Sequence, residues 1–315
     1  MLQVYGPPFL GRALFYEYVR VRILLAFNIL MLLPLLLLPL AAVLLNSISS
    51  VIDKSVLKRN RVNPGVYCGW IFAASIPFLL IGAAFIPSAV LPQAAEWGNI
   101  GILAASVLLI LTLNYLWYYA IKDEDLHEVQ GLELIRNVPA MLFAAVLFPA
   151  ERSIPLIVVG AVATAGIFFS HIHGKRFVLH KRLIPLALFL IFLAPWSASL
   201  TRLLLNSWSP ITLDIVRFSA VVLMFLPFLY RHRTARWREI LPPLLLSAAF
   251  SSAAWVLVYY SYLASGVVET ILFLLVQPVL VYAMSSLFLG ERITSRQVIG
   301  FAVAILAIGV SVFLR

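Results

Sequence analysis

Cysteine and charge are both scarce in this chain. Cys68 is the single cysteine among 315 residues, which excludes an internal disulfide and a cysteine-rich metal cluster. Charged residues make up 11% of the sequence, whereas an ordinary soluble domain carries about a quarter. So low a charge content does not suit a protein surrounded by water.

The common signatures of enzyme sites are missing as well. The sequence contains no glycine-rich phosphate loop, no nucleophile elbow and no H-E-x-x-H pair. An ATP-driven pump would need a nucleotide-binding domain, for which the chain has no room. His171, His173 and His180 lie beside lysines and arginines that disfavour a metal cation, so we expect a solvated loop there. We predict that the protein is not an enzyme and holds neither a metal nor a cofactor.

Apolar residues are abundant instead, at 63% of the chain, with a mean hydropathy of +1.02. Lipid must therefore be the solvent for most of the chain. A helix needs about 20 mostly apolar residues to cross the bilayer. Ten such windows cover approximately residues 30–52, 65–87, 98–121, 126–148, 154–173, 183–206, 211–230, 240–263, 267–289 and 297–314. We predict an all-α integral membrane protein with ten transmembrane helices, located in the cell membrane.

The basic residues lie in short runs between these windows and bring the formal net charge to +10. Loops that face anionic lipid explain this pattern, so nucleic-acid binding is not expected. The loops after the first, third, fifth, seventh and ninth windows hold fifteen basic residues, of which Lys54 is the first. The positive-inside rule places these loops in the cytoplasm and both termini outside.

A match of the chain with itself indicates a duplication. The run LFPAERSIPLIVVG at 147–160 aligns with LFLGERITSRQVIG at 287–300 at an offset of 140, as Tyr119 does with Tyr259. Further forward, IPFLL at 76–80 matches LPFLY at 226–230 at an offset of 150. Each copy holds five windows, and this odd number makes the copies enter the membrane in opposite orientations. We predict two inverted five-helix repeats, at 30–173 and 183–315.

Residues 1–29 lie outside the repeat and are too charged for a span. Two explanations stay open: an amphipathic helix at the membrane surface, and a start-site artefact with the true start at Met31. A signal peptide is not expected, because no small-residue cleavage site follows the apolar stretch.

Short motifs mark the ends of both copies. The second copy contains Asp214-Ile215-Val216-Arg217-Phe218, Gln277-Pro278-Val279, Phe288-Leu289-Gly290-Glu291-Arg292-Ile293-Thr294 and Gln297-Val298-Ile299-Gly300. The first copy carries a divergent version in Val138-Pro139, Pro149-Ala150-Glu151-Arg152 and Gly160. These motifs resemble those of EamA-type transporters of the drug/metabolite transporter superfamily.

The resemblance implies ten helices around a central cavity and movement of a small solute or metabolite. It also implies cytoplasmic termini, against the charge count, so the orientation stays open. One departure from the pattern is that the second window has no arginine to match Arg217.

Charged residues in the fourth window are the first candidates for a solute site. A charge at mid-membrane costs at least about 2.5–3.5 kcal/mol on insertion scales, so it persists mostly where it is paired or lines a wet cavity. Glu133 and Arg136 share a helix face, and Gln130, Glu133 and Asn137 form a stripe at i, i+3 and i+7. Glu133 therefore either contacts a solute or proton in a cavity, or forms a structural ion pair with Arg136.

The third, eighth and ninth windows add further cavity candidates. Glu269 lies near a helix start, where a solvated position is the alternative. Gln277 precedes Pro278, whose missing N–H favours a helix break that would shape a site or a hinge. Asn114, Trp255 and Tyr259 lie in aromatic clusters suited to organic solutes, but Trp and Tyr are also common anchors at the membrane interface, and we favour that interpretation.

The doubled Glu-Arg motifs have a structural interpretation. Glu151-Arg152 and Glu291-Arg292 lie at short turns, where we expect them to cap helices and to hold the repeat ends in place. Gly160 and Gly300 follow them in the next helix of each copy, and Pro278 precedes the second motif.

These observations favour a secondary transporter or facilitator. It would move a small-molecule solute through the lipid bilayer by alternating access around a cavity lined by the third, fourth, eighth and ninth helices. Coupling to a proton or another ion, and the oligomeric state, stay open. Two alternatives are a non-transporting membrane scaffold or subunit and a membrane-embedded enzyme acting on lipid-linked substrates.

Overall fold

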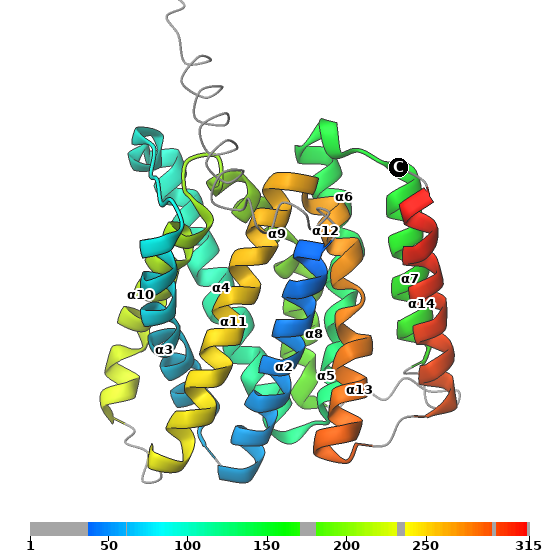
Figure 1. The fold of residues 1–315 in the computed structure, drawn as a ribbon, viewed down its shortest axis with the longest axis horizontal. Coiled ribbons are helices and arrows are strands. Elements are labelled where there is room, and N and C mark those ends of the chain that lie inside the picture. The colour runs from blue at the N-terminus through cyan, green and yellow to red at the C-terminus, as the bar shows by residue number, and fades with distance from the viewer. Residues whose placement is uncertain (1–36, 61, 171–180, 232–236, 292–293, 314–315) are drawn as a thin grey trace, which may run out of the picture.

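A computed structural model describes residues 37–60, 62–170, 181–231, 237–291 and 294–313, and these residues are almost entirely helical (Figure 1). The helices are α2 (Leu37–Asn60), α3 (Pro64–Phe85), α4 (Trp97–Asp123), α5 (Leu126–Glu133), α6 (Asn137–Leu147), α7 (Ile154–Ser170), α8 (Ile184–Phe192), α9 (Ala194–Leu204), α10 (Pro210–Arg231), α11 (Trp237–Ser265), α12 (Val267–Leu274), α13 (Gln277–Leu289) and α14 (Ser295–Phe313). The short 3₁₀ turns are η1 (Pro92–Ala95), η2 (Leu134–Arg136), η3 (Pro149–Glu151) and η4 (Lys181–Leu183). The N-terminal extension, the three loop histidines and Arg292 lie outside the described residues.

Seven segments of the described chain are long and apolar enough to cross a membrane. The bent pair α8 and α9, at 45°, would make an eighth. The apolar parts of α7 and α14, Ile154–Gly166 and Ser295–Ala307, are shorter. An all-α membrane fold is therefore confirmed, whereas the count of ten spans stays a prediction.

Prolines explain why three of the spans are broken. The turn η2 interrupts Leu126–Leu147 shortly before Pro139, and α12 gives way to α13 just before Pro278. The window at 183–206 was expected to form one helix, but it bends at Leu193, because Pro195 cannot continue the hydrogen bonds of the preceding turn.

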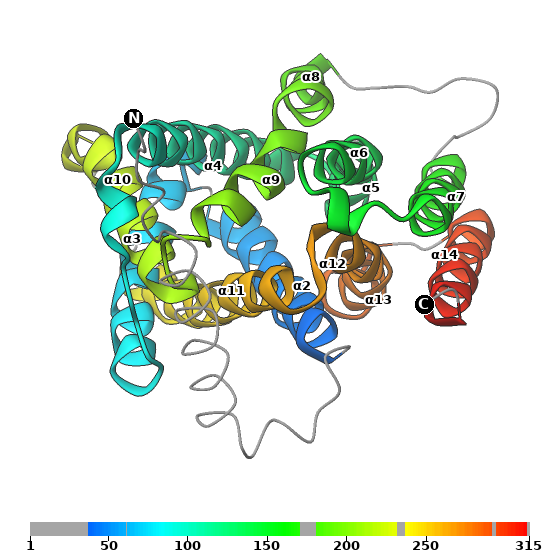
Figure 2. The ribbon, with the colours of Figure 1, turned by 90° about the horizontal axis from the view of Figure 1, so that it is seen from above.

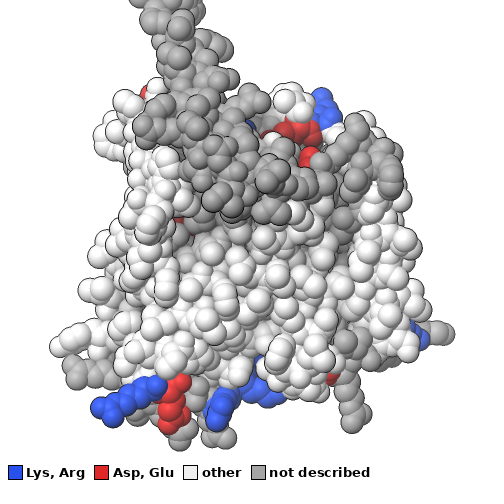
Figure 3. Space-filling model, in the orientation of Figure 1, with Lys and Arg blue, Asp and Glu red and all other residues white. Residues whose placement is uncertain are grey.

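The outer surface of the bundle carries many exposed apolar side chains. Leu80, Phe85, Leu108, Val146 and Leu223 are among many large apolar side chains that the fold leaves exposed. On the face seen in Figure 3, charged side chains gather at the two ends of the helices and leave a belt of other residues between them. This distribution suits a protein whose sides face lipid.

Helices of the first half pack against helices of the second half. Helix α3 packs on α10 and α7 packs on α14, and this second pair stands at one edge of the bundle (Figure 2). Helix α2 of the first half packs along α11 of the second half, and α9 of the second half packs against α4 of the first. The bundle has two ends. We call the end with Lys58, Arg59, Lys122 and Arg238 the basic face, and the end with η1 and η3 the opposite face.

Candidate functional site

A central cavity lies between helices of both halves. It consists of two adjoining pockets that share Arg136, Asn137, Trp255 and Leu274 in their walls. One pocket extends along α2 and the break between α12 and α13, and the other extends between α3, α4, α9 and α11. The cavity therefore touches nearly every helix of the central bundle.

The structure brings eight of the nine cavity candidates together at this place. The lining includes Asn114, Gln130, Glu133, Arg136, Asn137, Trp255, Tyr259 and Gln277. Pro278 lies beside them, at the start of α13. Glu269 lies apart, half-buried in the first turn of α12, and lines neither pocket.

The most polar wall comes from the fourth window. Glu133 and Arg136 form an ion pair of 2.5 Å between Oε1 and Nη2. Their side chains are 17% and 20% exposed, so the pair borders the cavity and is not sealed in protein. Gln130, one turn earlier, is buried, and its Nε2 has no hydrogen-bond partner in the described part of the chain. An unsatisfied donor in a cavity wall is available to a ligand.

The aromatic wall comes from α11. Tyr259 and Tyr262 are each 4% exposed and line the cavity, and this burial contradicts the interpretation of Tyr259 as an interfacial anchor. Trp255 is half-buried between the two pockets. Asn114 donates to the carbonyl of Ile110 in its own helix at 2.9 Å, and its side-chain oxygen is left for other partners.

Near the opposite face, one buried guanidinium is surrounded by hydroxyl groups. Arg217 is fully buried and donates to Ser106 Oγ at 3.0 Å, Tyr259 OH at 3.1 Å and Thr201 Oγ1 at 2.9 Å. We call these four residues the arginine cluster. The sequence had suggested Arg217 only as a motif residue. Its position inside an apolar window is the signal that could have revealed a buried role.

Near the basic face, a second buried cluster surrounds a carboxyl group. Tyr67 donates to Asp53 Oδ1 at 2.6 Å and Tyr118 donates to Oδ2 at 3.4 Å. Ser247 also donates to Oδ1. We call these four residues the aspartate cluster, and all of them are buried. Sequence reasoning missed it, because Asp53 falls just beyond the first apolar window.

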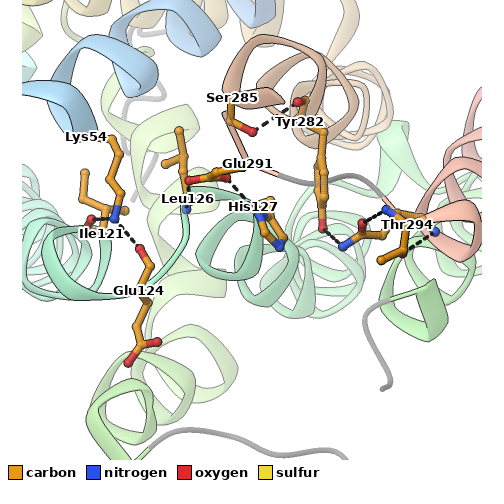
Figure 4. A network of polar contacts seen from close by, with 10 residues as sticks. Lys54, Ile121, Glu124, Leu126, His127, Tyr282, Ser285, Glu291 and Thr294 are labelled. Carbon is orange, nitrogen blue, oxygen red and sulfur yellow. Dashed lines mark hydrogen bonds and ion pairs between the residues drawn. The ribbon is translucent and has the colours of Figure 1, made fainter. Parts of the chain in front are cut away.

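Lys54 lies next to this cluster and corrects the loop assignment made from the sequence. It is 2% exposed within α2, and its Nζ donates to the carbonyls of Ile121 and Glu124, each at 2.6 Å (Figure 4). These carbonyls lie at the end of α4, where a helix carries partial negative charge and lacks internal donors. Lys54 thus caps α4 from a neighbouring helix and does not belong to the basic loop.

The glutamates of the doubled motif each cap a helix of the other half. Glu151 accepts from the backbone N–H groups of Val267 and Val268 at 2.6 and 3.4 Å, at the start of α12. Glu291 accepts from the N–H of Leu126 at 3.1 Å and from His127 Nδ1 at 2.8 Å, at the start of α5 (Figure 4). The two contacts connect the halves at opposite ends of the bundle.

The two capping carboxyls differ in their electrostatics. Burial raises the pKa of Glu151, and the hydrogen bonds from Val267 and Val268 only partly offset this effect. Burial also acts to raise the pKa of Glu291, but the hydrogen bonds from His127 and Leu126 outweigh it, so the pKa is lowered.

The other motif residues have packing roles. Gly160 in α7 lies against Met141, where an added Cβ would approach the sulfur to 2.7 Å. Gly300 is buried in α14 at the contact with α7, and its carbonyl oxygen lies 3.6 Å from the Cβ position of Gly166. Arg152 is exposed and donates to the carbonyl of Ala145 at 3.4 Å.

The fold and the cavity define a helical membrane protein of the transporter type. Residues 182–313 match the EamA-like transporter family, and this match confirms the resemblance seen in the motifs of the second half. A solved structure described as "Crystal structure of protein" covers 89% of this chain and 96% of its own, with a TM-score of 0.64 and 12% identity. The two proteins share a fold. No curated protein matches the chain in sequence.

Proposed function

We propose that the protein is a secondary transporter or facilitator that moves a small organic solute by alternating access through the central cavity. The observation that carries this proposal is the convergence of eight polar and aromatic side chains on one cavity inside a lipid-facing bundle. Polar groups are costly at this depth, and they persist where they line a solute path. The match of the second half to a transporter family supports the same function.

The proposal includes two inverted five-helix repeats in a cell membrane. The reciprocal packing of α2 on α11 and of α9 on α4 supports it, as do the reciprocal caps made by Glu151 and Glu291. In Figure 1, α2 runs from the opposite face to the basic face, whereas α9 runs the other way, as inverted copies require.

Within this site, Glu133 and Arg136 would contact the polar part of the solute. Gln130, Asn114 and Gln277 would add hydrogen bonds, and Trp255 and Tyr259 would contact an apolar or aromatic part. A cavity with one charge of each sign suits a solute that carries polar and apolar groups together.

The direct test is a melting-temperature screen of the purified protein against a panel of small metabolites. A solute that binds only the folded state raises the melting temperature. Glu133→Gln should weaken the shift given by a binding solute by about 10-fold in affinity or more, because a hydrogen bond to a charged group contributes about 1.5–3 kcal/mol. Glu128→Gln, earlier on α5 and outside the cavity wall, is the matched control.

A charge reversal separates the solute contact from a structural ion pair. The double variant Glu133→Arg with Arg136→Glu keeps the pair but reverses its field. If the pair is only structural, the double variant should bind solutes like the wild type. If no solute raises the melting temperature, or if Glu133→Gln and Glu128→Gln behave alike, the site assignment is wrong.

A further inference from the structure

The aspartate cluster and the arginine cluster are equivalent positions of the two halves. Helices α3 and α10 each contain an interior proline, Pro77 and Pro227. Tyr67 and Arg217 both lie ten residues before that proline, so they occupy the same place in their helices. Each is bonded to the helix that precedes its own, Tyr67 to Asp53 and Arg217 to Thr201.

The other two members of each cluster correspond as well. Ser106 and Tyr118 lie twelve residues apart on α4, and Ser247 and Tyr259 lie twelve residues apart on α11. This shared spacing makes Tyr118 the equivalent of Tyr259 in the other half. It replaces the earlier pairing of Tyr119 with Tyr259, since Tyr119 is 51% exposed and Tyr259 is buried.

Each cluster takes three residues from one half and a serine from the other. Ser247 of the second half donates to Asp53 of the first, and Ser106 of the first half accepts from Arg217 of the second at 3.0 Å. Within each cluster, the serine contact is the one that joins the halves, and Ser247 Oγ also lies 2.8 Å from Ser49 Oγ of the first half. Every residue of both clusters is buried.

The two clusters lie at opposite ends of the cavity. Asp53, Tyr67 and Tyr118 lie within about two turns of the helix ends at the basic face. Arg217, Thr201 and Tyr259 lie within about two turns of the helix ends at the opposite face. Tyr118 from one cluster and Thr201 and Tyr259 from the other form part of the cavity wall.

We propose that these clusters are the two gates of the transporter: the aspartate cluster closes the cavity toward the basic face, and the arginine cluster closes it toward the opposite face. The proposal rests on the proposed function. Alternating access requires the halves to separate at one face at a time, and the inter-half serine bond at that face must break when they do. Because these bonds involve a charged group, each biases the closed state of its gate about 10-fold or more.

The equivalence offers a matched pair of variants. Ser247→Ala and Ser106→Ala remove the same hydroxyl from equivalent positions and leave the other three members of each cluster in place. The reporter is Ser251→Cys in the cavity wall, in a Cys68→Ala background that removes the buried native thiol. Ser252→Ala is the control, because the Ser252 hydroxyl donates to Ala249 of its own helix.

The measurement is the rate at which a membrane-impermeant thiol reagent labels the Ser251→Cys reporter, with the reagent added from one face or the other in vesicles of defined orientation. Ser247→Ala should raise labelling from the basic face and lower it from the opposite face, by about 10-fold or more. Ser106→Ala should do the reverse, and Ser252→Ala should change neither rate.

Two failures are distinguishable. If the reporter without further substitution is labelled from one face only, with or without a solute, the proposed function and the gates fall together. If the reporter is reached from both faces but both serine variants shift labelling in the same direction, or leave it unchanged while the protein stays folded, the gate proposal alone is overturned.

Discussion

At the scale of single residues, three buried charged side chains have neutral hydrogen-bond partners, and Arg217 also interacts with the buried carboxyl group of Asp214, three residues earlier on α10. Asp53 accepts hydrogen bonds from hydroxyls, Arg217 donates to hydroxyls, and Lys54 donates to backbone carbonyls. A buried charge without such partners would cost several kcal/mol, so the partners explain why these side chains can lie so deep.

Lys54 offers a test of this view. Lys54→Met keeps the apolar stem but leaves the carbonyls of Ile121 and Glu124 without this donor, so we expect a loss of about 1–3 kcal/mol in stability. Lys58→Met, one turn later and exposed, should have little effect. Thermal unfolding in detergent makes the comparison, and equal melting temperatures for the two variants would refute the role given to Lys54.

The capping glutamates predict opposite pH dependences. The lowered pKa of Glu291 means that its stabilising contribution is present above about pH 4.5, the ordinary value, and is lost as the pH falls below it. The raised pKa of Glu151 means that its contribution is present below about pH 4.5 and is lost as the pH rises through the raised value.

The stability gap between wild type and Glu291→Gln should therefore widen with rising pH, to about 0.5–2 kcal/mol, as for a lost helix cap. The gap between wild type and Glu151→Gln should narrow over the same range. Unfolding measured from about pH 4 to pH 7 tests both, and parallel pH profiles for the two variants would contradict the assignment.

At the scale of elements, two glycines at helix ends have a positive φ but differ in their surroundings. Gly266, before α12, has φ +84°, and a Cβ there would lie 2.7 Å from the Glu151 carboxyl carbon. Gly290, after α13, has φ +70° and open space around it. Glycine is therefore needed at position 266 for two reasons: it adopts the positive φ without strain, and it leaves space for the Glu151 carboxyl group that caps α12.

Gly290→Ala should cost only the backbone strain, about 1–2 kcal/mol. Gly266→Ala should cost more, because it also displaces Glu151 from the start of α12. The melting temperatures of the two variants test this, and Gly266→Ala should have the lower one. An equal loss for both would show that the contact with Glu151 contributes nothing.

The sequence predicted the limits of two spans closely, one of them in spite of the charged residues within it. The windows at 126–148 and 267–289 correspond to the segments Leu126–Leu147 and Val267–Leu289, including the break beside Pro278. The bend at Leu193 was missed, although Pro195 marks it. The length of an apolar window predicts that a segment is helical, but it does not predict how far a proline bends the helix.

The cavity candidates could be found from the sequence because each is a polar or aromatic residue in an apolar window. The two clusters could not, since their contacts join residues as far apart as Asp53 and Ser247, 194 positions distant. Ordinary serines and tyrosines carry no signal until the helices are placed side by side. We infer the pairing of Tyr118, and not of Tyr119, with Tyr259 from the burial of these residues in the fold.

At the scale of the whole molecule, the cavity, the two clusters and the reciprocal caps belong to one arrangement. The clusters and the caps of one half each have a counterpart in the other half at the opposite end of the bundle. Under the proposed function, two conformations of similar energy would expose the same cavity to one face or the other.

Counterflow in proteoliposomes tests this account most directly. Vesicles preloaded with a solute found in the melting-temperature screen should take up trace labelled solute transiently above equilibrium, because the unlabelled solute inside competes with the labelled solute for the inward-facing carrier and slows its exit. Glu133→Gln should abolish this overshoot and Glu128→Gln should keep it. If a binding solute is found and the folded wild-type protein gives no overshoot above protein-free vesicles, the protein is not an alternating-access transporter.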